Sequence, residues 1–425
     1  MTRATRWIVW GVILTTVLDG PLRYVLVRIG GAALIYAKDI AVIGLLSYVL
    51  LYSAIAFRIS RTLLIFLLLI VYGVLAGLVN HLPVMQVLFG AKMLFPFIVG
   101  YLAITRLGFG KDDIAGLYRV VVPVVVFGLI LDKAFTLPWE TLTYEAFDTA
   151  VEAMRNRATF GLERLSGFGR APHETAAMLF ALVAVYAALM TQGEISRTVR
   201  GKIYDSILLV AALIGVVLTT SKSALLAFFV LAALFGAVYI YRHRSRVFGV
   251  IGQFGIKALL TVLFLYGIVP PALTFVSPSL ITRFLISDNL ILIFILSSYV
   301  DRVERMWPAA FALISSSYQY LTGRGIGGIG AAQVYFESGA YNPADNLYVY
   351  LFISFGMVVL ALLLVWFLFK LFRLRLHERA SVYLLCMGVG LFCFGATGNV
   401  VESPALSIGF GFLLALWQRE NDDLR

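Results

Sequence analysis

Charged residues are scarce in this chain: of its 425 amino acids, only 13% are charged, while 61% are hydrophobic. Soluble globular domains usually carry about a quarter of their residues as charged side chains. The scarcity of charge therefore excludes an ordinary soluble domain. It predicts a membrane protein.

Cysteine and histidine are also rare, with two and four residues respectively. Cys386 and Cys393 lie in one apolar run, on roughly the same side of one helix, where the geometry of a disulfide cannot be met. Cysteine therefore gives no information about the redox compartment. No His or Cys pair has the spacing of metal ligands, and no Ser, His and acid set suggests a catalytic triad. We expect no metal and no other cofactor.

Internal repeats, low-complexity segments and hydrophilic domains are missing from the sequence. There are also no interrupted apolar segments in matching halves of the chain, which a transporter built from repeats would show. We therefore predict a single all-α membrane domain that covers residues 1–425.

Apolar runs of roughly 18 to 25 residues recur along the chain, each about the length that a helix needs to cross a bilayer core. They predict a polytopic bundle of about 12 transmembrane helices. The first run follows Arg3 and Arg6 but precedes no cleavage site, so we interpret it as an uncleaved helix. The predicted spans are residues 7–29, 38–57, 62–79, 84–105, 114–131, 173–190, 205–219, 223–241, 248–269, 346–369, 381–397 and 404–418.

The formal net charge is +11, which in a soluble protein would suggest a nucleic-acid partner. Here the cations lie in short loops between apolar runs, so the positive-inside rule explains them better and we expect no nucleic acid. With the basic loops and both termini in the cytoplasm, two long loops face outward, residues 133–172 and 270–345. Within the second, residues 280–298 predict an interfacial or re-entrant segment.

A few charged residues lie in or near the predicted spans themselves. They are Lys38, Asp39, Lys92 and Arg119. Buried charges are costly in a membrane and are often functional, but the sequence assigns no role to these four.

The second outer loop contains the stretch GRGIGGIGAAQVYFESGAYNPADNLYVY, in which Gly325, Gly327 and Gly330 form a GxGxxG pattern. A dinucleotide site needs this pattern between a strand and a helix of a βαβ unit, whereas an outer loop and a membrane helix flank it here. Two interpretations remain: a flexible turn without function, or glycines that let the backbone approach an anionic lipid head group.

Cations gather in this outer loop, where the positive-inside rule predicts few. Arg302 and Arg305 are spaced to share a helix face, and Arg324 follows. In one interpretation, Asp301 and Glu304 simply neutralise the first two as solvated pairs. The alternative is an anion site, since the guanidinium suits phosphate oxygens. Lys222 points to the same side from a short outer turn; as a single lysine at a helix start it could also snorkel to the interface.

The first outer loop carries a second basic cluster in RNRATFGLERLSGFGRAPHETAAMLF. Its arginines are Arg155, Arg157, Arg164 and Arg170, and His173 stands at the start of the next helix. His173 is a candidate general base, but Pro172 and Glu174 beside it are typical helix-start residues, so the segment can equally be a cap. We group Arg157, Arg164, Arg170, His173 and Tyr341 as possible substrate-binding residues.

Asp345 and Asn346 precede the apolar run LYVYLF. Asp-Asn is a common N-cap pair, but a carboxylate at the bilayer surface beside cations is also placed to take a proton from a sugar hydroxyl. The aromatic residues near it are candidates for stacking on sugar faces, or else interface anchors. They are Trp307, Tyr335, Tyr341 and Tyr348.

The order of these segments resembles the bacterial O-antigen ligase and polysaccharide polymerase superfamily. The likeness covers about residues 157–356 and rests on TSKSALLAFF, DRVERMWPAAF, YLTGRGIGGIG and ADNLYVYLFISFGMVVL, with RLSGFGRAPHETAAMLF before them. It implies a bundle of about twelve spans with one large periplasmic loop that contains short helices. It also implies transfer of a glycan from undecaprenyl pyrophosphate to a sugar hydroxyl, without nucleotide or metal.

Two positions depart from that family. Lys222 follows Ser221 where members usually have arginine, and Asp345 precedes Asn346 where ligases typically have histidine. Because that histidine is the proposed base of the ligases, the departure favours the polymerase branch.

The resemblance therefore implies an O-antigen or exopolysaccharide polymerase, a GT-C-like glycosyltransferase of the bacterial inner membrane whose active site faces the periplasm. Asp345 would be the base and Asn346 would orient it, while Lys222, Arg302, Arg305 and Arg324 would bind the donor pyrophosphate. The expected partners are undecaprenyl-pyrophosphate-linked oligosaccharide, the lipid bilayer and a chain-length regulator. The alternatives are an O-antigen ligase that uses lipid A core, and a lipid-linked oligosaccharide flippase or transporter.

Overall fold

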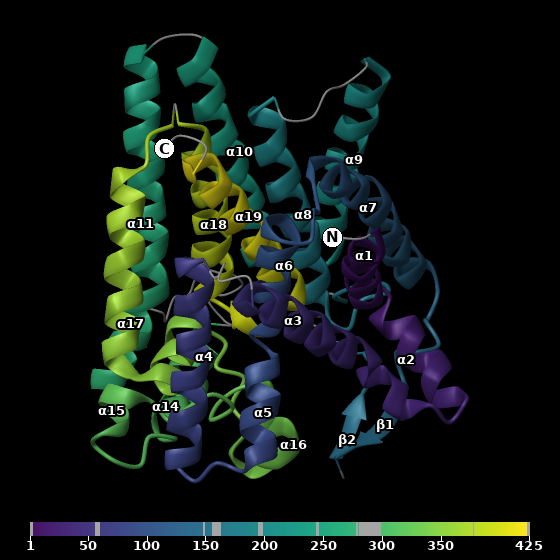
Figure 1. Cartoon of the computed structure of the whole chain (residues 1–425), viewed down its shortest axis with the longest axis vertical. Coiled ribbons are helices and arrows are strands. Elements are labelled where there is room, and N and C mark those ends of the chain that lie inside the picture. Colours follow the sequence, from purple (N-terminus) through teal and green to yellow (C-terminus); the bar gives the residue numbers. More distant parts are fainter. Residues whose placement is uncertain are drawn as a thin grey trace.

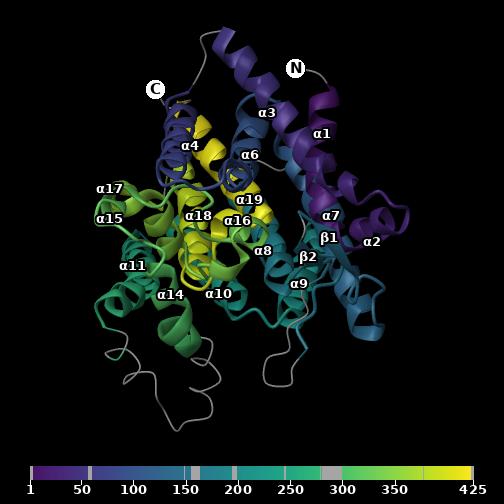
Figure 2. The same ribbon diagram turned by 90° about the horizontal axis from the view of Figure 1, so that it is seen from below.

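The computed structural model describes residues 3–55, 60–147, 149–154, 163–193, 199–243, 246–277, 279, 299–376 and 378–422. Long helices form a bundle, and short helices and a β-hairpin gather at one end of it (Figures 1 and 2). We call this end, built from residues 143–152 and 299–346, the loop end. The end of α10 (Lys222–His243) and the start of α11 (Arg246–Val276) lie at the opposite end (Figure 1). The predicted helical class is confirmed, apart from the hairpin.

Within the described residues, each of the twelve apolar runs is helical over most of its length. The long elements are α1 (Arg3–Val17), α2 (Asp19–Arg28), α3 (Ala37–Ile55), α4 (Arg61–Val79), α5 (Val84–Lys92), α6 (Phe95–Thr105), α7 (Lys111–Ala134), α8 (Pro172–Thr191), α9 (Val199–Leu218), α10 (Lys222–His243), α11 (Arg246–Val276), α17 (Leu347–Arg373), α18 (Arg379–Gly395) and α19 (Pro404–Asp422).

Nine helices or helix pairs within the described ranges are long and apolar enough to cross a membrane, or ten if the bent pair α1 and α2 is one span. The apolar helix α18 has 17 residues and falls short of that test, and α19 is not among the candidates either. The chain is therefore a multi-pass membrane protein by its helices, and the count of twelve stays a prediction.

The first predicted span, residues 7–29, is not one straight helix, because α1 and α2 meet at an angle of 84°. Pro21 stands in the first turn of α2, and it has no backbone N–H with which to continue the hydrogen-bond ladder of α1. The 3₁₀ turn η1 (Ala32–Tyr36) then connects α2 to α3. The break brings the polar residue Asp19 into the interior.

The core lies where α6, α8, α18 and α19 pack together, and apolar residues from Val9 to Leu416 join it in one cluster. Glycine lets α6 and α19 approach closely. A Cβ on Gly100 would overlap the backbone of Ile408, and one on Gly411 would overlap that of Phe97. Small residues of this kind are what bring helices together where surrounding lipid is as apolar as the helices.

The two predicted outer loops are partly structured. Residues 133–172 contain an antiparallel hairpin, β1 (Thr143–Ala146) and β2 (Thr149–Glu152), which the sequence analysis did not predict. The second loop contains the short helices expected there: the π-helical turn η2 (Arg302–Met306), α14 (Trp307–Phe311), α15 (Gln319–Thr322), α16 (Ala331–Phe336) and η3 (Ser338–Ala340). That loop begins later than predicted, because α11 continues through Pro270 and Pro271. The predicted interfacial segment, 280–298, lies outside the described residues.

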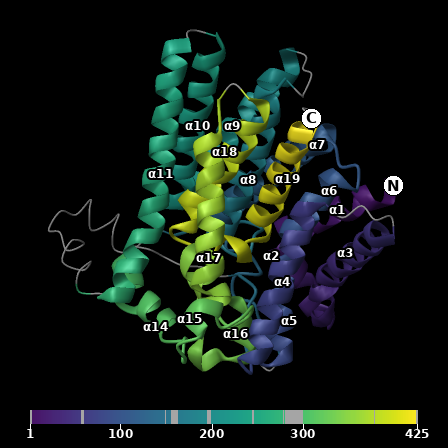
Figure 3. The same cartoon turned by 60° about the vertical axis from the view of Figure 1, so that its left-hand side comes forward.

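Helix α17 runs along the outside of the bundle (Figure 3) and changes direction at Gly356, whose φ is 77°. A break of this kind leaves backbone carbonyls without their helical partners. Those of Ile353 and Ser354 accept hydrogen bonds from the backbone N–H groups of Arg324 and Gly325, at 2.6 and 3.1 Å. The glycine loop of the sequence is thus inserted at the break in α17.

Candidate functional site

Arg302 and Asp345 form an ion pair at the loop end. Nη2 of Arg302 lies 3.0 Å from Oδ2 of Asp345 and also donates to the backbone carbonyl of Thr397 at 3.0 Å. The side chains are 12% and 30% exposed, so the carboxylate stays accessible while the arginine is largely covered. Two residues that the sequence analysis assigned to different roles are therefore in direct contact.

The backbone at Asp345 is strained. Ala344 and Asp345 have φ values of 62° and 40°, which lie in the left-handed region that side chains other than glycine rarely adopt. Such residues typically cost about 1–3 kcal/mol each and persist where their surroundings hold them. Here Asn342 does so: its Oδ1 accepts from the Ala344 N–H at 2.9 Å, and its Nδ2 donates to the Met306 carbonyl at 2.7 Å.

The same asparagine therefore connects the Asp345 turn to the π-helical turn that carries Arg302. A π-turn widens a helix by one residue and is frequent at functional sites. Asn342 is 4% exposed and buried between these two segments. Its position fixes how the carboxylate and the guanidinium face each other.

Asn346 is a helix cap. Its Oδ1 accepts from the backbone N–H groups of Tyr348 and Val349 at 2.8 and 3.1 Å, as expected of an N-cap. Its Nδ2 donates to the carbonyls of Gly267 and Ala396, at 2.9 and 3.1 Å. The side chain is fully buried. Asn346 thus joins α17 to α11 and α18, and it supports Asp345 through the backbone of the helix start.

Two further cations, Lys222 and Arg164, belong to the same group as Arg302. Lys222 is the first residue of α10, and the charges that act on it are those of Arg164 and Arg302. The hydroxyl of Ser223, next to Lys222, contacts the hydroxyl of Thr397, whose carbonyl binds Arg302. Segments that are far apart in the sequence thus contribute three interacting cations, one of which, Arg302, binds the Asp345 carboxylate.

Arg305 is placed differently from Arg302. It pairs with Asp301 within its own helical turn, with its Nε 2.5 Å from Oδ1, and its side chain is 80% exposed. For Arg305 the solvated-pair interpretation therefore describes the structure. For Arg302 it does not, because the partner of Arg302 comes from another segment.

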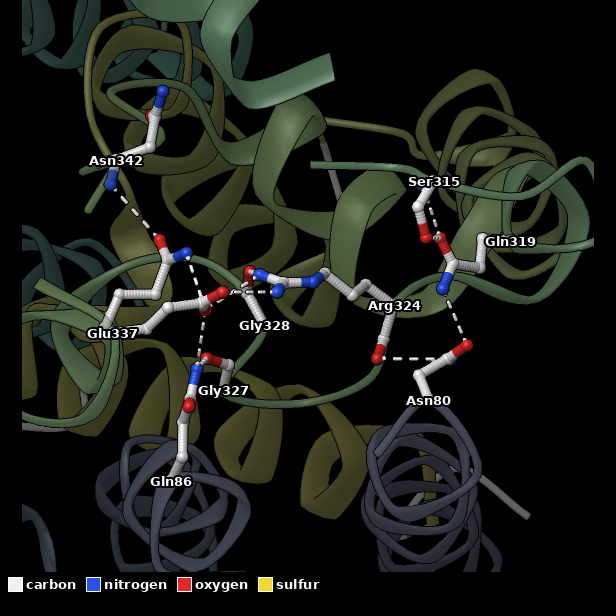
Figure 4. A network of polar contacts seen from close by, with 10 residues as sticks. Asn80, Gln86, Ser315, Gln319, Arg324, Gly327, Gly328, Glu337 and Asn342 are labelled. Carbon is white, nitrogen blue, oxygen red and sulfur yellow. Dashed lines mark hydrogen bonds and ion pairs between the residues drawn. The ribbon is translucent and has the colours of Figure 1, made fainter. Parts of the chain in front are cut away.

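Arg324 binds a carboxylate of its own (Figure 4). Its Nη1 and Nη2 donate to the two oxygens of Glu337 at 3.0 and 2.6 Å, and Nη1 also donates to the Gly328 carbonyl at 2.7 Å. Glu337 accepts further hydrogen bonds from Gln86 on α5 and from Gln333, at 3.1 and 3.2 Å. The side chain of Arg324 therefore connects two parts of the glycine loop, Gly328 and Glu337, by hydrogen bonds.

The ionised form of Glu337 is the one that this network holds. Burial by itself would raise the pKa of Glu337, but the hydrogen bonds from Arg324, Gln333 and Gln86 outweigh burial and bring its pKa below the ordinary value. Arg324 balances the charge of this carboxylate, and the two neutral amides add hydrogen bonds to it.

The glycines of the GxGxxG pattern pack against protein backbone. A Cβ on Gly325 would overlap the backbone of Gly77 on α4, and one on Gly327 would lie 2.5 Å from the Gln86 carbonyl oxygen. Their φ values, 101° and 85°, also favour glycine. The loop follows the short helix α15, not a strand, so the arrangement of a dinucleotide site is not formed. The close approach that the glycines permit is to α4 and α5.

The remaining predicted site residues are scattered. Arg157, like Arg155, lies outside the described residues. Arg170 is half-buried and its charge acts on Tyr144 of the hairpin. His173 is exposed at the start of α8, and Tyr341 is 38% exposed.

Two of the aromatic residues proposed to stack on sugars are part of the core instead. Trp307 is fully buried and packs edge-on against Tyr299, with ring centroids 5.3 Å apart. Tyr348 is 4% exposed and packs against Phe264. Neither ring face can reach a ligand, so that expectation was wrong for both. The spacing of aromatics in a sequence does not distinguish a core ring from an exposed one.

Sequence reasoning missed the residues that position the site. Asp132 on α7 accepts from the backbone N–H groups of Ser166 and Gly167, both at 2.7 Å, and so fixes the segment that carries Arg164. Asn342, Thr397 and Glu337 act in a similar way on Asp345, Arg302 and Arg324. None belongs to a pattern with a recognised chemical role, and an isolated polar residue gives no sequence signal.

No family model, curated protein or solved structure matches this chain, so its function is argued from the geometry of this site.

Proposed function

We propose that this chain is a polysaccharide polymerase of the bacterial inner membrane. It joins glycan repeat units that are linked to undecaprenyl pyrophosphate, and the loop end with its active site faces the periplasm. The observation that carries the proposal is the ion pair of Arg302 with the partly exposed Asp345 carboxylate, together with Lys222, on which the charges of Arg302 and Arg164 act. Cations beside a candidate base suit a reaction that releases pyrophosphate from a sugar and needs a deprotonated hydroxyl.

The proposed reaction is one displacement at the anomeric carbon of the donor. The acceptor hydroxyl oxygen forms a bond to that carbon while the bond from the carbon to the pyrophosphate oxygen breaks. The electron pair of the broken bond stays on pyrophosphate, and Asp345 takes the hydroxyl proton. The cations stabilise the negative charge that develops on the leaving group.

The ion pair has a role in this scheme before substrate arrives. Arg302 is held by Asp345 and by the Thr397 carbonyl, so the guanidinium is already oriented when a pyrophosphate approaches. Pyrophosphate then competes with Asp345 for the same guanidinium, which leaves the carboxylate available for the acceptor hydroxyl. Binding of the donor thus frees the carboxylate of Asp345 to act as the base. The acceptor hydroxyl is therefore activated only after the donor has bound.

The test is polymerisation in vitro. Purified protein in detergent is given a synthetic undecaprenyl-pyrophosphate repeat unit with EDTA present, and the products are resolved by length. We expect a ladder with the unaltered protein. Asp345→Ala should slow its formation by roughly a thousandfold, the typical contribution of a positioned general base. Asp345→Asn, which keeps size and hydrogen bonding, should be equally slow if proton transfer is what is lost.

Arg305→Ala is the matched control, because Arg305 carries the same charge three residues from Arg302 but is exposed and paired within its own turn. It should form the ladder at nearly the original rate. Product that appears only when lipid A core is supplied would replace the polymerase by a ligase. A ladder that Asp345→Ala leaves unchanged would remove Asp345 from the mechanism.

A further inference from the structure

A second charged cluster lies where α1 breaks into α2. Arg23 and Lys38 both bind Asp19: Nε of Arg23 lies 2.5 Å from Oδ2, and Nζ of Lys38 lies 2.5 Å from Oδ1. Arg23 also donates to the hydroxyl of Tyr144 on the hairpin. These three charged side chains sum to one positive charge. None of them belongs to the site around Asp345.

A neighbouring ion pair, Lys92 and Asp39, is neutral and leaves the net positive charge of the cluster unchanged. Lys92 on α5 binds Asp39 at 2.8 Å, with its amine 4.0 Å from the ring centroid of Phe89. The charges of Lys38 and Arg23 also act on Lys92. Among the described residues, the cluster thus has three cations and two carboxylates. An excess positive charge among apolar helices is costly unless an anion accompanies it.

A groove of about 360 Å³ opens beside this cluster, between α1, α2, η1 and α3. Asp19, Arg23 and Lys38 line one part of it, while the rest is apolar and includes Ile8, Leu26 and Leu34. These helices lie on the side of the bundle away from α11 (Figures 1 and 3). Ile8 and Leu34 are 39% and 56% exposed, so the wall of the groove continues onto the apolar outer surface of the helices.

We propose that this groove binds a membrane lipid whose head group carries a phosphate. A hydrocarbon chain of the lipid occupies the apolar part between α1 and α3, and the phosphate lies against Lys38 and Arg23. Phosphate supplies the negative charge that the cluster lacks, and the size of the groove is that of an ordinary small-molecule site.

The two cations have different parts in this arrangement. The Arg23 side chain is 9% exposed and is used by Asp19 and Tyr144, so it sets the shape and charge of the site. The Lys38 side chain is 24% exposed, and its compact ammonium is the group that a phosphate reaches first. An apolar ligand without charge would gain the hydrophobic contact but would leave the positive charge unbalanced.

The inference is independent of the proposed polymerase activity, because the groove and the site around Asp345 share no residue. It concerns a lipid that the protein holds, whichever reaction the loop end performs. A failure of polymerisation therefore leaves it standing, and a failure of lipid binding at the groove leaves the polymerase proposal standing.

The test compares two lipids that differ only in the phosphate. Delipidated full-length protein in detergent is titrated with phosphatidic acid and with diacylglycerol of the same chains, and binding is followed by native mass spectrometry. Inorganic phosphate is added as a competitor to detect a site for phosphate alone. We expect phosphatidic acid to bind at least about tenfold more tightly than diacylglycerol, the difference that one well-placed charge contact can make.

Gly11→Leu tests the groove itself. Gly11 lines the groove, and a Cβ at this position meets no atom within 4 Å, so leucine fills the space without a clash against backbone. It should weaken phosphatidic acid binding by about tenfold or more. Gly44→Leu is the matched control, since Gly44 on α3 is equally open but lies outside the groove. It should bind as the unaltered protein does.

Lys38→Gln tests the charge and keeps a polar side chain beside Asp19. It should reduce the preference for phosphatidic acid over diacylglycerol by roughly fivefold, on the order of one charged hydrogen bond. Equal binding of the two lipids, or Gly11→Leu binding phosphatidic acid like Gly44→Leu, would overturn the proposal. So would complete displacement of the lipid by millimolar inorganic phosphate.

Discussion

Arg302 and Arg324 belong to the same predicted outer loop and carry the same side chain, yet their surroundings differ. Arg324 binds both oxygens of Glu337 and a carbonyl of its own loop, so its hydrogen bonds serve the loop. Arg302 binds one oxygen of a partly exposed carboxylate, and Lys222 and Arg164 add their charges nearby. In the first arrangement, the charge of Glu337 balances that of Arg324. In the second, Arg302, Lys222 and Arg164 are positive and Asp345 is negative, so these four residues have more positive than negative charge.

An arginine in an outer loop therefore has to be interpreted through the groups that it contacts. A charge that violates the positive-inside rule needs a counter-charge, but that counter-charge can be a carboxylate of the same loop. Where cations from separate segments instead act on one another, as Lys222, Arg164 and Arg302 do, the group is a candidate anion site. Arg302 meets that condition, while Arg324 and Arg305 do not.

The comparison predicts opposite effects for two similar substitutions. Arg302→Ala should lower turnover by roughly a thousandfold, the effect of removing one preorganised donor to a developing anion. It should change stability little, since the carboxylate of Asp345 loses a single hydrogen bond. Arg324→Ala should instead lower the free energy of unfolding by about 2 kcal/mol, because Glu337 loses its main partner, and should keep turnover within about tenfold. Polymerisation rates and unfolding in mixed micelles measure the two quantities.

The double variant Arg324→Ala/Glu337→Gln provides the control for this pair. Removing the carboxylate charge together with its arginine should recover part of the lost stability. If Arg324→Ala abolished turnover in protein that unfolds like the original, Arg324 would belong with Arg302 at the substrate, and the comparison would fail.

The glycine loop gives a second, smaller test of the Arg324 region. Gly325→Ala should destabilise the protein by about 3 kcal/mol, because the new methyl group overlaps the backbone of Gly77 and the φ of 101° disfavours alanine. Gly339→Ala in the same loop has open space around it and should change stability by less than about 0.5 kcal/mol. Unfolding in mixed micelles compares them. Equal stability of the two variants would mean that the loop is not packed as described.

The smallest expected effect is a pH dependence that distinguishes the two regions. The pKa of Glu337 is lower in the folded protein than its ordinary value. Its contribution to stability is therefore present above the unfolded pKa of about 4.3 and is lost as the pH falls through the folded pKa. Because Glu337 is partly exposed, we expect less than about 1 kcal/mol.

Unfolding of the original protein and of Glu337→Gln, followed from pH 6 to pH 3 (roughly the range across which a lowered carboxyl pKa is felt), isolates this contribution. The difference in stability between the two should shrink toward low pH. A difference that stays constant across the range would show that the Glu337 charge does not hold the loop.

Much of the fold follows from the sequence because a bilayer permits few alternatives. A long apolar run can satisfy its backbone only as a helix, so each of the twelve predicted runs is helical. The bend at Asp19 and the break at Gly356 were not predicted. Each depends on the side chains or backbone groups from other segments that contact the chain at that point. Arg23 and Lys38 stabilise Asp19 in the first case, and the loop at Arg324 and Gly325 supplies the missing hydrogen bonds in the second.

The candidate site was predicted only as a set of residue types. The sequence named Arg302, Lys222 and Asp345 but placed Arg305 and Arg324 with them, because sequence spacing cannot show which carboxylate each arginine meets. It also assigned Asn346 to orienting Asp345, whereas its amide caps α17 and joins two other helices. The hairpin was missed because each of its strands has only four residues, too few for an alternating pattern to stand out.

Hydrophobic length and loop charge are local properties of a chain. For that reason the sequence alone is enough to predict a multi-pass helical membrane protein with its unexplained cations in two loops. The contacts of those cations are visible only in the folded protein. There Arg302 binds Asp345, Arg305 and Arg324 are neutralised by Asp301 and Glu337, and Arg23 and Lys38 line a groove. Those outcomes depend on contacts between segments far apart in the sequence, and the energy of a charge in a membrane protein is set by the groups packed around it.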